Sequence, residues 1–113
     1  MANQRKSQRA PCDIYLNKIV DEARHLARAR DISPDGIWIS KVLEPAAGQQ
    51  QVGLEFQLPG SSEVIWAAGE VVRDETREAA TGPVEGTAVK FTAMADRYRR
   101  MIEVYVSRTA GNA

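Results

Sequence analysis

Residues 52–58 read VGLEFQL, and this stretch decides the fold class. Apolar side chains occupy every second position from Val52 to Leu58, with glycine, glutamate and glutamine between them. Because successive side chains of a strand point to opposite faces, this alternation predicts a half-buried β-strand. The sequence PGSS at residues 59–62 then turns the chain.

Further strand-like segments lie on both sides of this stretch. Residues 64–73 carry apolar side chains on both faces, and residues 87–91 alternate again. Residues 36–43 are also strand-like, and the glutamine-rich residues 45–51 form a loop after them. The stretch 75–85 is polar and contains a Gly-Pro pair, so we expect it to be a loop. The fold class is therefore mainly β.

The period of the apolar residues changes near the end of the chain. From about residue 95 to about residue 107 they recur at spacings of three and four, which predicts an amphipathic helix. Several strands followed by one packed helix predict a small antiparallel barrel capped by that helix, since closure removes exposed sheet edges. The apolar stripe consists of Tyr98, Met101, Ile102, Tyr105 and Val106.

Composition narrows the function classes. The 113 residues form one domain with zero net charge, which argues against a general DNA- or RNA-binding surface. Cys12 is the single cysteine and cannot form an intramolecular disulfide, which suits a reducing cytoplasm. His25 is the single histidine, so we expect no histidine-based metal site and no catalytic pairing. No apolar run approaches eighteen residues, so we expect no membrane insertion and a cytoplasmic location.

Two short motifs suggest a binding site. Residues 5–9 form an R-x-x-x-R pattern, and residues 31–36 form D-x-S-x-x-G. Arginine donates in parallel to phosphate oxygens or to the O6/N7 edge of guanine. The carboxylate of Asp31 suits the N1-H and N2-H donors of guanine, Ser33 can hydrogen-bond to phosphate or base, and Gly36 permits close approach of backbone. Taken alone, the R-x-x-x-R motif could be a solvated basic tail, and the D-x-S-x-x-G motif could be an ordinary turn.

The two motifs, in this order and ahead of strand-like segments and a final helix, resemble those of the PilZ domain family. The resemblance extends from about Gln4 to about Val106. It implies a six-stranded antiparallel β-barrel with a C-terminal α-helix, and a receptor for the bacterial second messenger cyclic di-GMP rather than an enzyme. It implies no cofactor and no metal. The ligand-binding residues that it implies are Arg5, Arg9, Asp31, Ser33 and Gly36.

Residues 17–30 conflict with this family pattern. They are rich in Ala, Glu, Arg and Leu, so local propensity favours a helix. The family pattern requires strand, turn and strand in the same place. We predict strand–turn–strand, because tertiary context readily overrides helix propensity.

The domain organisation implied is a flexible basic segment over residues 1–12, a barrel with its helix over residues 13–107, and a tail over residues 108–113. We expect the N-terminal segment to close over the ligand and so to change the surface shown to a partner protein. The resemblance implies outputs in motility, exopolysaccharide production or virulence, through partner proteins. We expect a monomer or weak dimer, and the zero net charge predicts that it binds no DNA or RNA. In the family, the residue before the first motif is associated with whether one ligand or a stacked pair binds. That residue is Gln4 here, and one or two ligands per chain stay open as alternatives.

Two other functions are weighed against this one. A PilZ-like adaptor would keep the fold and act by protein contact without binding nucleotide, but this chain retains both arginines and the second motif. A small-barrel enzyme with a flavin or a similar cofactor has no residues that support it.

Overall fold

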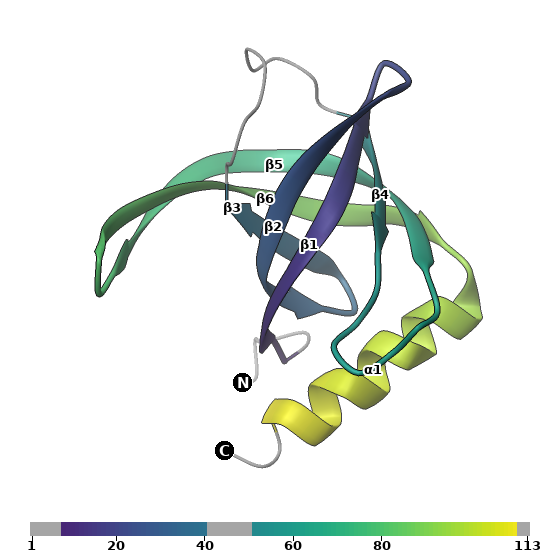
Figure 1. Cartoon of the computed structure of the whole chain (residues 1–113). Helices are drawn as coiled ribbons and strands as arrows, with labels where there is room; N and C mark the ends of the chain where they lie inside the picture. Colours follow the sequence, from purple (N-terminus) through teal and green to yellow (C-terminus); the bar gives the residue numbers. More distant parts are fainter. Residues whose placement is uncertain (1–7, 41–50, 111–113) are drawn as a thin grey trace, which may run out of the picture.

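The computed structural model describes residues 8–40 and 51–110, and these residues form six strands and one helix (Figure 1). The strands close into an antiparallel barrel in the order β1-β2-β3-β6-β5-β4. This confirms the predicted six-stranded barrel with its C-terminal helix. The elements are β1 (Ala10–Val20), β2 (Ala23–Ser33), β3 (Gly36–Ser40), β4 (Gln51–Phe56), β5 (Ile65–Ala79), β6 (Gly82–Met94) and α1 (Asp96–Ala110).

The barrel core is filled by the alternate residues that the sequence pattern assigned to it. On β4 the side chains of Val52, Leu54 and Phe56 are buried, and Leu58 continues the same face beyond the strand. On β5 the inward residues include Ile65, which has no exposed surface. Burial of these inward side chains supplies the hydrophobic free energy that holds the sheet closed.

Residues 17–30 form strand, turn and strand, as predicted against local propensity. Val20 pairs with Ala23, and the two residues between them, Asp21 and Glu22, have φ values of 51° and 68°. A two-residue hairpin loop with positive φ at both positions matches the right-handed twist of its strands. Inward packing of alternate β2 residues such as Ala27 and Ala29 outweighs the helix propensity of the segment.

The prediction of a loop over residues 75–85 is wrong. Strand β5 continues to Ala79 and β6 begins at Gly82, with twelve paired positions between the two strands from Ala67↔Met94 to Ala79↔Gly82. The distal half of this hairpin extends beyond the pairing of β5 with β4, which ends at Glu70. Most of its side chains are exposed or half-buried, so no apolar alternation marks it as strand.

Helix α1 lies across one end of the barrel (Figure 1). Ile102 and Val106 are buried in the core cluster, and Tyr98, Met101 and Tyr105 pack against that cluster. The predicted apolar stripe is therefore the face that contacts the strands. Within residues 8–40 and 51–110, no helix has the length and apolar character that crossing a membrane requires.

Segment boundaries differ in places from those predicted. Strand β1 includes residues 10–12, which the sequence placed in the N-terminal segment, and α1 extends to Ala110. Strand β3 is described as far as Ser40, and residues 41–43 of the strand predicted there lie outside the described residues. The loop predicted over residues 45–51 also lies outside them, except for Gln51, which begins β4.

Candidate ligand site

The D-x-S-x-x-G motif forms the end of β2, the turn to β3 and the first residue of β3. The Ser33 hydroxyl accepts hydrogen bonds from the backbone N–H groups of Asp35 and Gly36, both at 3.2 Å. Ser33 is 1% exposed, so this hydroxyl points into the turn. A serine that bonds backbone groups two and three residues ahead fixes the turn by the usual side-chain mimicry of a backbone turn.

Gly36 is required by a neighbouring strand. It pairs with Lys90 of β6, and a Cβ atom at position 36 would lie 2.5 Å from the carbonyl oxygen of Val89. We expected this glycine to permit approach of backbone to a ligand. The close approach that the structure contains is between β3 and β6.

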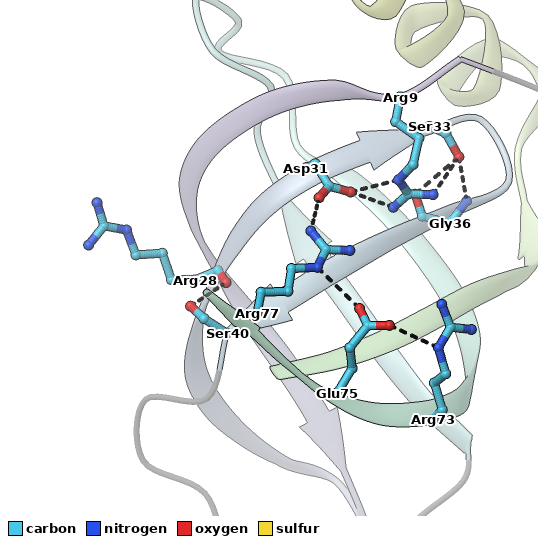
Figure 2. Close-up of polar contacts among 9 residues, drawn as sticks. All are labelled: Arg9, Arg28, Asp31, Ser33, Gly36, Ser40, Arg73, Glu75 and Arg77. Atoms are coloured by element: carbon cyan, nitrogen blue, oxygen red, sulfur yellow. Dashed lines mark hydrogen bonds and ion pairs between the residues drawn. The ribbon is translucent and has the colours of Figure 1, made fainter. Parts of the chain in front are cut away.

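Arg9 joins the first motif to the second (Figure 2). Its Nε donates to Oδ1 of Asp31 at 2.7 Å, and its Nη1 donates to the Ser33 hydroxyl at 3.3 Å. The Nη2 of Arg9 lies 2.6 Å from the same Asp31 oxygen. Four of the five predicted site residues are therefore brought together, and Arg5 lies outside the described residues.

A second arginine, which the sequence did not indicate, also reaches Asp31. The Nη1 of Arg77, on β5, donates to Oδ2 of Asp31 at 2.5 Å. Its Nε donates to Glu75 at 3.1 Å, and Glu75 in turn accepts a hydrogen bond from Arg73 at 3.0 Å (Figure 2). The guanidinium of Arg77 lies over the ring of Trp38, with Cζ 4.1 Å from the ring centroid.

Glu75 and Arg77 were missed because they belong to the segment predicted as a loop, and Arg73 is the last residue of the strand predicted before it. Arg73, Glu75 and Arg77 occur at every second position, so in a strand they share one face. The alternation of positive and negative side chains at every second position is the sequence signal that could have indicated a strand here. The hydrogen bonds from Arg73 and then Arg77 hold the pKa of Glu75 below its ordinary value, so Glu75 is an anion at neutral pH.

A groove of about 610 Å³ lies beside this network. Its lining includes Gly36 and Trp38, and Asp35 contributes a carboxylate. The cationic side chains that line the groove are Arg9, Arg73, Arg77, Lys90 and Arg99. Positive charges clustered on a concave surface attract anions and concentrate them locally.

Another groove, of about 730 Å³, lies between α1 and the loop that joins β4 to β5. Its lining includes Leu58, Pro59, Met101 and Val104, and it contains none of the motif residues. The 610 Å³ groove is the candidate site, because Arg9 and Gly36 of the two motifs line it together with the cationic cluster, and Arg9 and Arg77 of its lining both contact Asp31. Among the described residues, no three His, Cys, Asp or Glu side chains are grouped so that they could hold a metal ion.

Comparisons with known proteins agree with this geometry. A family model described as the PilZ domain matches residues 3–108. No curated protein sequence matches the chain significantly.

Three solved structures share the fold. The Bacillus subtilis inhibitor of motility (MotI/DgrA) superimposes with a TM-score of 0.81 at 15% identity, over 98% of this chain and 53% of that one. The PilZ domain of YcgR from Escherichia coli, solved with c-di-GMP, gives a TM-score of 0.75 at 13% identity, over 97% and 94% of the two chains. MrkH, described as a c-di-GMP-dependent transcription regulatory factor, gives 0.78 at 15% identity, over 100% and 54%. The chain thus spans about half the length of MotI and MrkH.

Proposed function

The chain belongs to the PilZ domain family, and on that premise we propose that it is a receptor for cyclic di-GMP. The observation that carries the proposal is the meeting of Arg9, Asp31 and the Ser33 turn beside a cationic groove. Cyclic di-GMP offers two phosphates, which need cationic donors, and two guanines, which need an acceptor for N1-H and N2-H. The described residues supply both kinds of group.

Each motif residue has a distinct role in this proposal. Arg5 and Arg9 donate to phosphate oxygens or to the O6/N7 edge of guanine. Asp31 accepts from the opposite edge of guanine. Ser33 and Gly36 set the turn and the strand spacing that hold Asp31 in place, which the contacts of Ser33 with backbone N–H groups support.

The proposal includes a change in the N-terminal segment. Arg9 immediately precedes β1, and 41% of its side chain is exposed, so the N–H groups that it does not use on Asp31 and Ser33 are accessible to ligand. Ligand that bridges residues 1–9 to the barrel would order that segment and alter the surface presented to a partner protein. A partner that acts in motility, exopolysaccharide production or virulence is the expected output.

Isothermal titration calorimetry of cyclic di-GMP into the protein tests the receptor function, with GTP and cyclic di-AMP as control ligands. We expect saturable binding of cyclic di-GMP alone. Arg9→Ala should weaken it about five- to hundredfold, because loss of a bidentate contact costs about 1–3 kcal/mol. Arg24→Ala is the matched control, since Arg24 pairs with Glu55 of β4 and neither residue lines the groove.

The outcomes separate the functions. Equal weakening by both arginine substitutions would point to general charge attraction instead of a site at Arg9. No heat at high micromolar protein would contradict the receptor and favour the nucleotide-independent adaptor. Hydrogen exchange tests the N-terminal change separately: protection of residues 1–9 should rise with ligand, and equal protection in both samples would contradict it.

A further inference from the structure

We propose that Arg77 competes with guanine for Asp31 and thereby sets the affinity of the site. The inference rests on the proposed function, since it concerns how cyclic di-GMP reaches its acceptor. Its structural basis is the contact between Nη1 of Arg77 and Oδ2 of Asp31 at 2.5 Å. The Asp31 side chain is 18% exposed, and arginine nitrogens lie against both of its oxygens.

The acceptor positions of Asp31 are nearly filled by these contacts. A carboxylate offers about four lone-pair positions, two on each oxygen. Arg9 places two nitrogens within 2.7 Å of Oδ1, and Arg77 places one on Oδ2. About one acceptor position therefore remains for the two N–H donors of a guanine edge. An arginine contact must be given up for guanine to bind.

Arginine and guanine compete because they present the same chemical group. The N1–C2–N2 edge of guanine is a guanidine fragment with two parallel N–H donors. The guanidinium of arginine has the same planar arrangement and carries a full positive charge as well. A side chain of this kind already bonded to Asp31 thus imitates the ligand edge that the carboxylate would receive.

Arg77 is the arginine better placed to leave. When it releases Asp31, its Nε can keep the hydrogen bond to Glu75 and its guanidinium can keep its position over Trp38. Arg9, in contrast, also donates to the buried Ser33 hydroxyl, which organises the turn. Release of Arg77 therefore sacrifices fewer contacts.

Titration of cyclic di-GMP into Arg77→Met tests the competition, since methionine keeps an apolar side chain against Trp38 but cannot donate to Asp31. We expect binding to tighten about two- to fivefold, which corresponds to the loss of a partly exposed ion pair. Arg73→Met is the matched control: it removes the same charge from the same strand face, and Arg73 contacts Glu75. It should weaken binding, because Arg73 lines the groove and the ligand is an anion.

Cyclic di-IMP provides a second measurement. Its hypoxanthine base has N1-H but lacks the N2 amino group, so one acceptor position suffices. The gain from Arg77→Met should therefore fall towards onefold with this ligand. Equal gains with both ligands would overturn the acceptor competition, as would equal or weaker binding of cyclic di-GMP by Arg77→Met than by the unmodified chain.

Failure of this inference is distinguishable from failure of the receptor function. If the unmodified chain and Arg77→Met both fail to bind cyclic di-GMP, the receptor function is contradicted, and the competition falls with it. If the unmodified chain binds and Arg77→Met does not bind more tightly, only the competition is contradicted. Thermal melts of both methionine variants check that each remains folded at the titration temperature.

Discussion

Gly36 contributes to the motif through packing as well as through any contact with ligand. A Cβ atom at this position would lie 2.5 Å from the Val89 carbonyl oxygen, which is backbone and cannot move aside by a rotamer change. We predict that Gly36→Ala lowers the free energy of unfolding by about 1–3 kcal/mol, the usual cost of overpacking. Denaturant titration measures it.

Gly53→Ala is the control for this prediction. The nearest atom to its added Cβ is the Ile19 Cβ at 3.4 Å, an ordinary contact on the outside of the barrel. We expect this variant to unfold at a denaturant concentration close to that of the unmodified protein. If the two alanine variants lose equal stability, the clash with Val89 is not the cause.

Cys12 should make the stability of the fold depend on pH at the alkaline end. Burial, followed by the nearby charges of Asp31 and Asp13, raises the pKa of its thiol from 9.0 to about 12. Because the folded pKa exceeds the unfolded one, the thiol's contribution is fully present below pH 9 and is lost as pH rises towards about 12.

The measurement for Cys12 is the free energy of unfolding at several pH values between 8 and about 11, compared with Cys12→Ala. The variant removes the thiol, so the difference in stability between the two proteins should shrink as pH rises through this window. Other groups titrate there in both proteins and cancel in the difference. A difference that is constant with pH would contradict the raised pKa.

At the level of single residues, the sequence predicted what its motifs contain and missed what a neighbouring strand adds. Arg9, Asp31, Ser33 and Gly36 come together as the motif spacing indicated. Arg77 lies 46 positions beyond Asp31, and its position depends on the register of β5 with β6, which local composition does not fix. Contacts that depend on the long-range register of strands cannot be predicted from a local sequence motif.

The hairpin between β1 and β2 contains a local weakness that can be corrected. Glu22 has a φ of 68°, a left-handed conformation that costs a residue with a Cβ about 1 kcal/mol. We predict that Glu22→Gly raises the free energy of unfolding by about 0.5–1 kcal/mol, after allowing for the greater freedom of glycine in the unfolded chain. Denaturant unfolding with a constant m-value provides the measurement.

Glu78→Gly is the matched control for the hairpin prediction. Glu78 is an exposed glutamate that pairs with Pro83 inside the β5–β6 hairpin and does not have a positive φ. Glycine should weaken the strand there, lowering stability by about 0.5–1 kcal/mol. If both glycine substitutions destabilise the protein, relief of the left-handed conformation at Glu22 is contradicted.

Elements were predictable where one face is buried. Residues 52–58 alternate because their inward side chains fill the core, and residues 98–106 show the helical period for the same reason. The distal β5–β6 hairpin has little buried surface, so it shows no apolar period, and its polar composition imitates a loop. Residues 17–30 needed the family pattern, because their composition alone favours helix.

The whole molecule is held together at one end by α1. Tyr105 donates to the Pro11 carbonyl at 2.7 Å, and Arg99 donates to the Pro34 carbonyl at 2.6 Å. The helix thus contacts both the start of β1, beside Arg9, and the turn that follows Ser33. The packing of α1 and the geometry of the candidate site are therefore linked through these two hydrogen bonds.

This connection makes the helix essential to global stability. Ile102 has no exposed surface, and truncation of such a residue leaves a cavity in the core. We predict that Ile102→Ala lowers the free energy of unfolding by about 2–5 kcal/mol. Val104→Ala is the control on the same helix: Val104 is 48% exposed, and alanine favours helix, so stability should change by less than about 0.5 kcal/mol.

Far-ultraviolet circular dichroism, which reports mainly the helix here, and tryptophan fluorescence from the barrel should give the same midpoint for each protein. Separate midpoints would mean that α1 unfolds independently of the barrel, because a single cooperative unit loses both signals together.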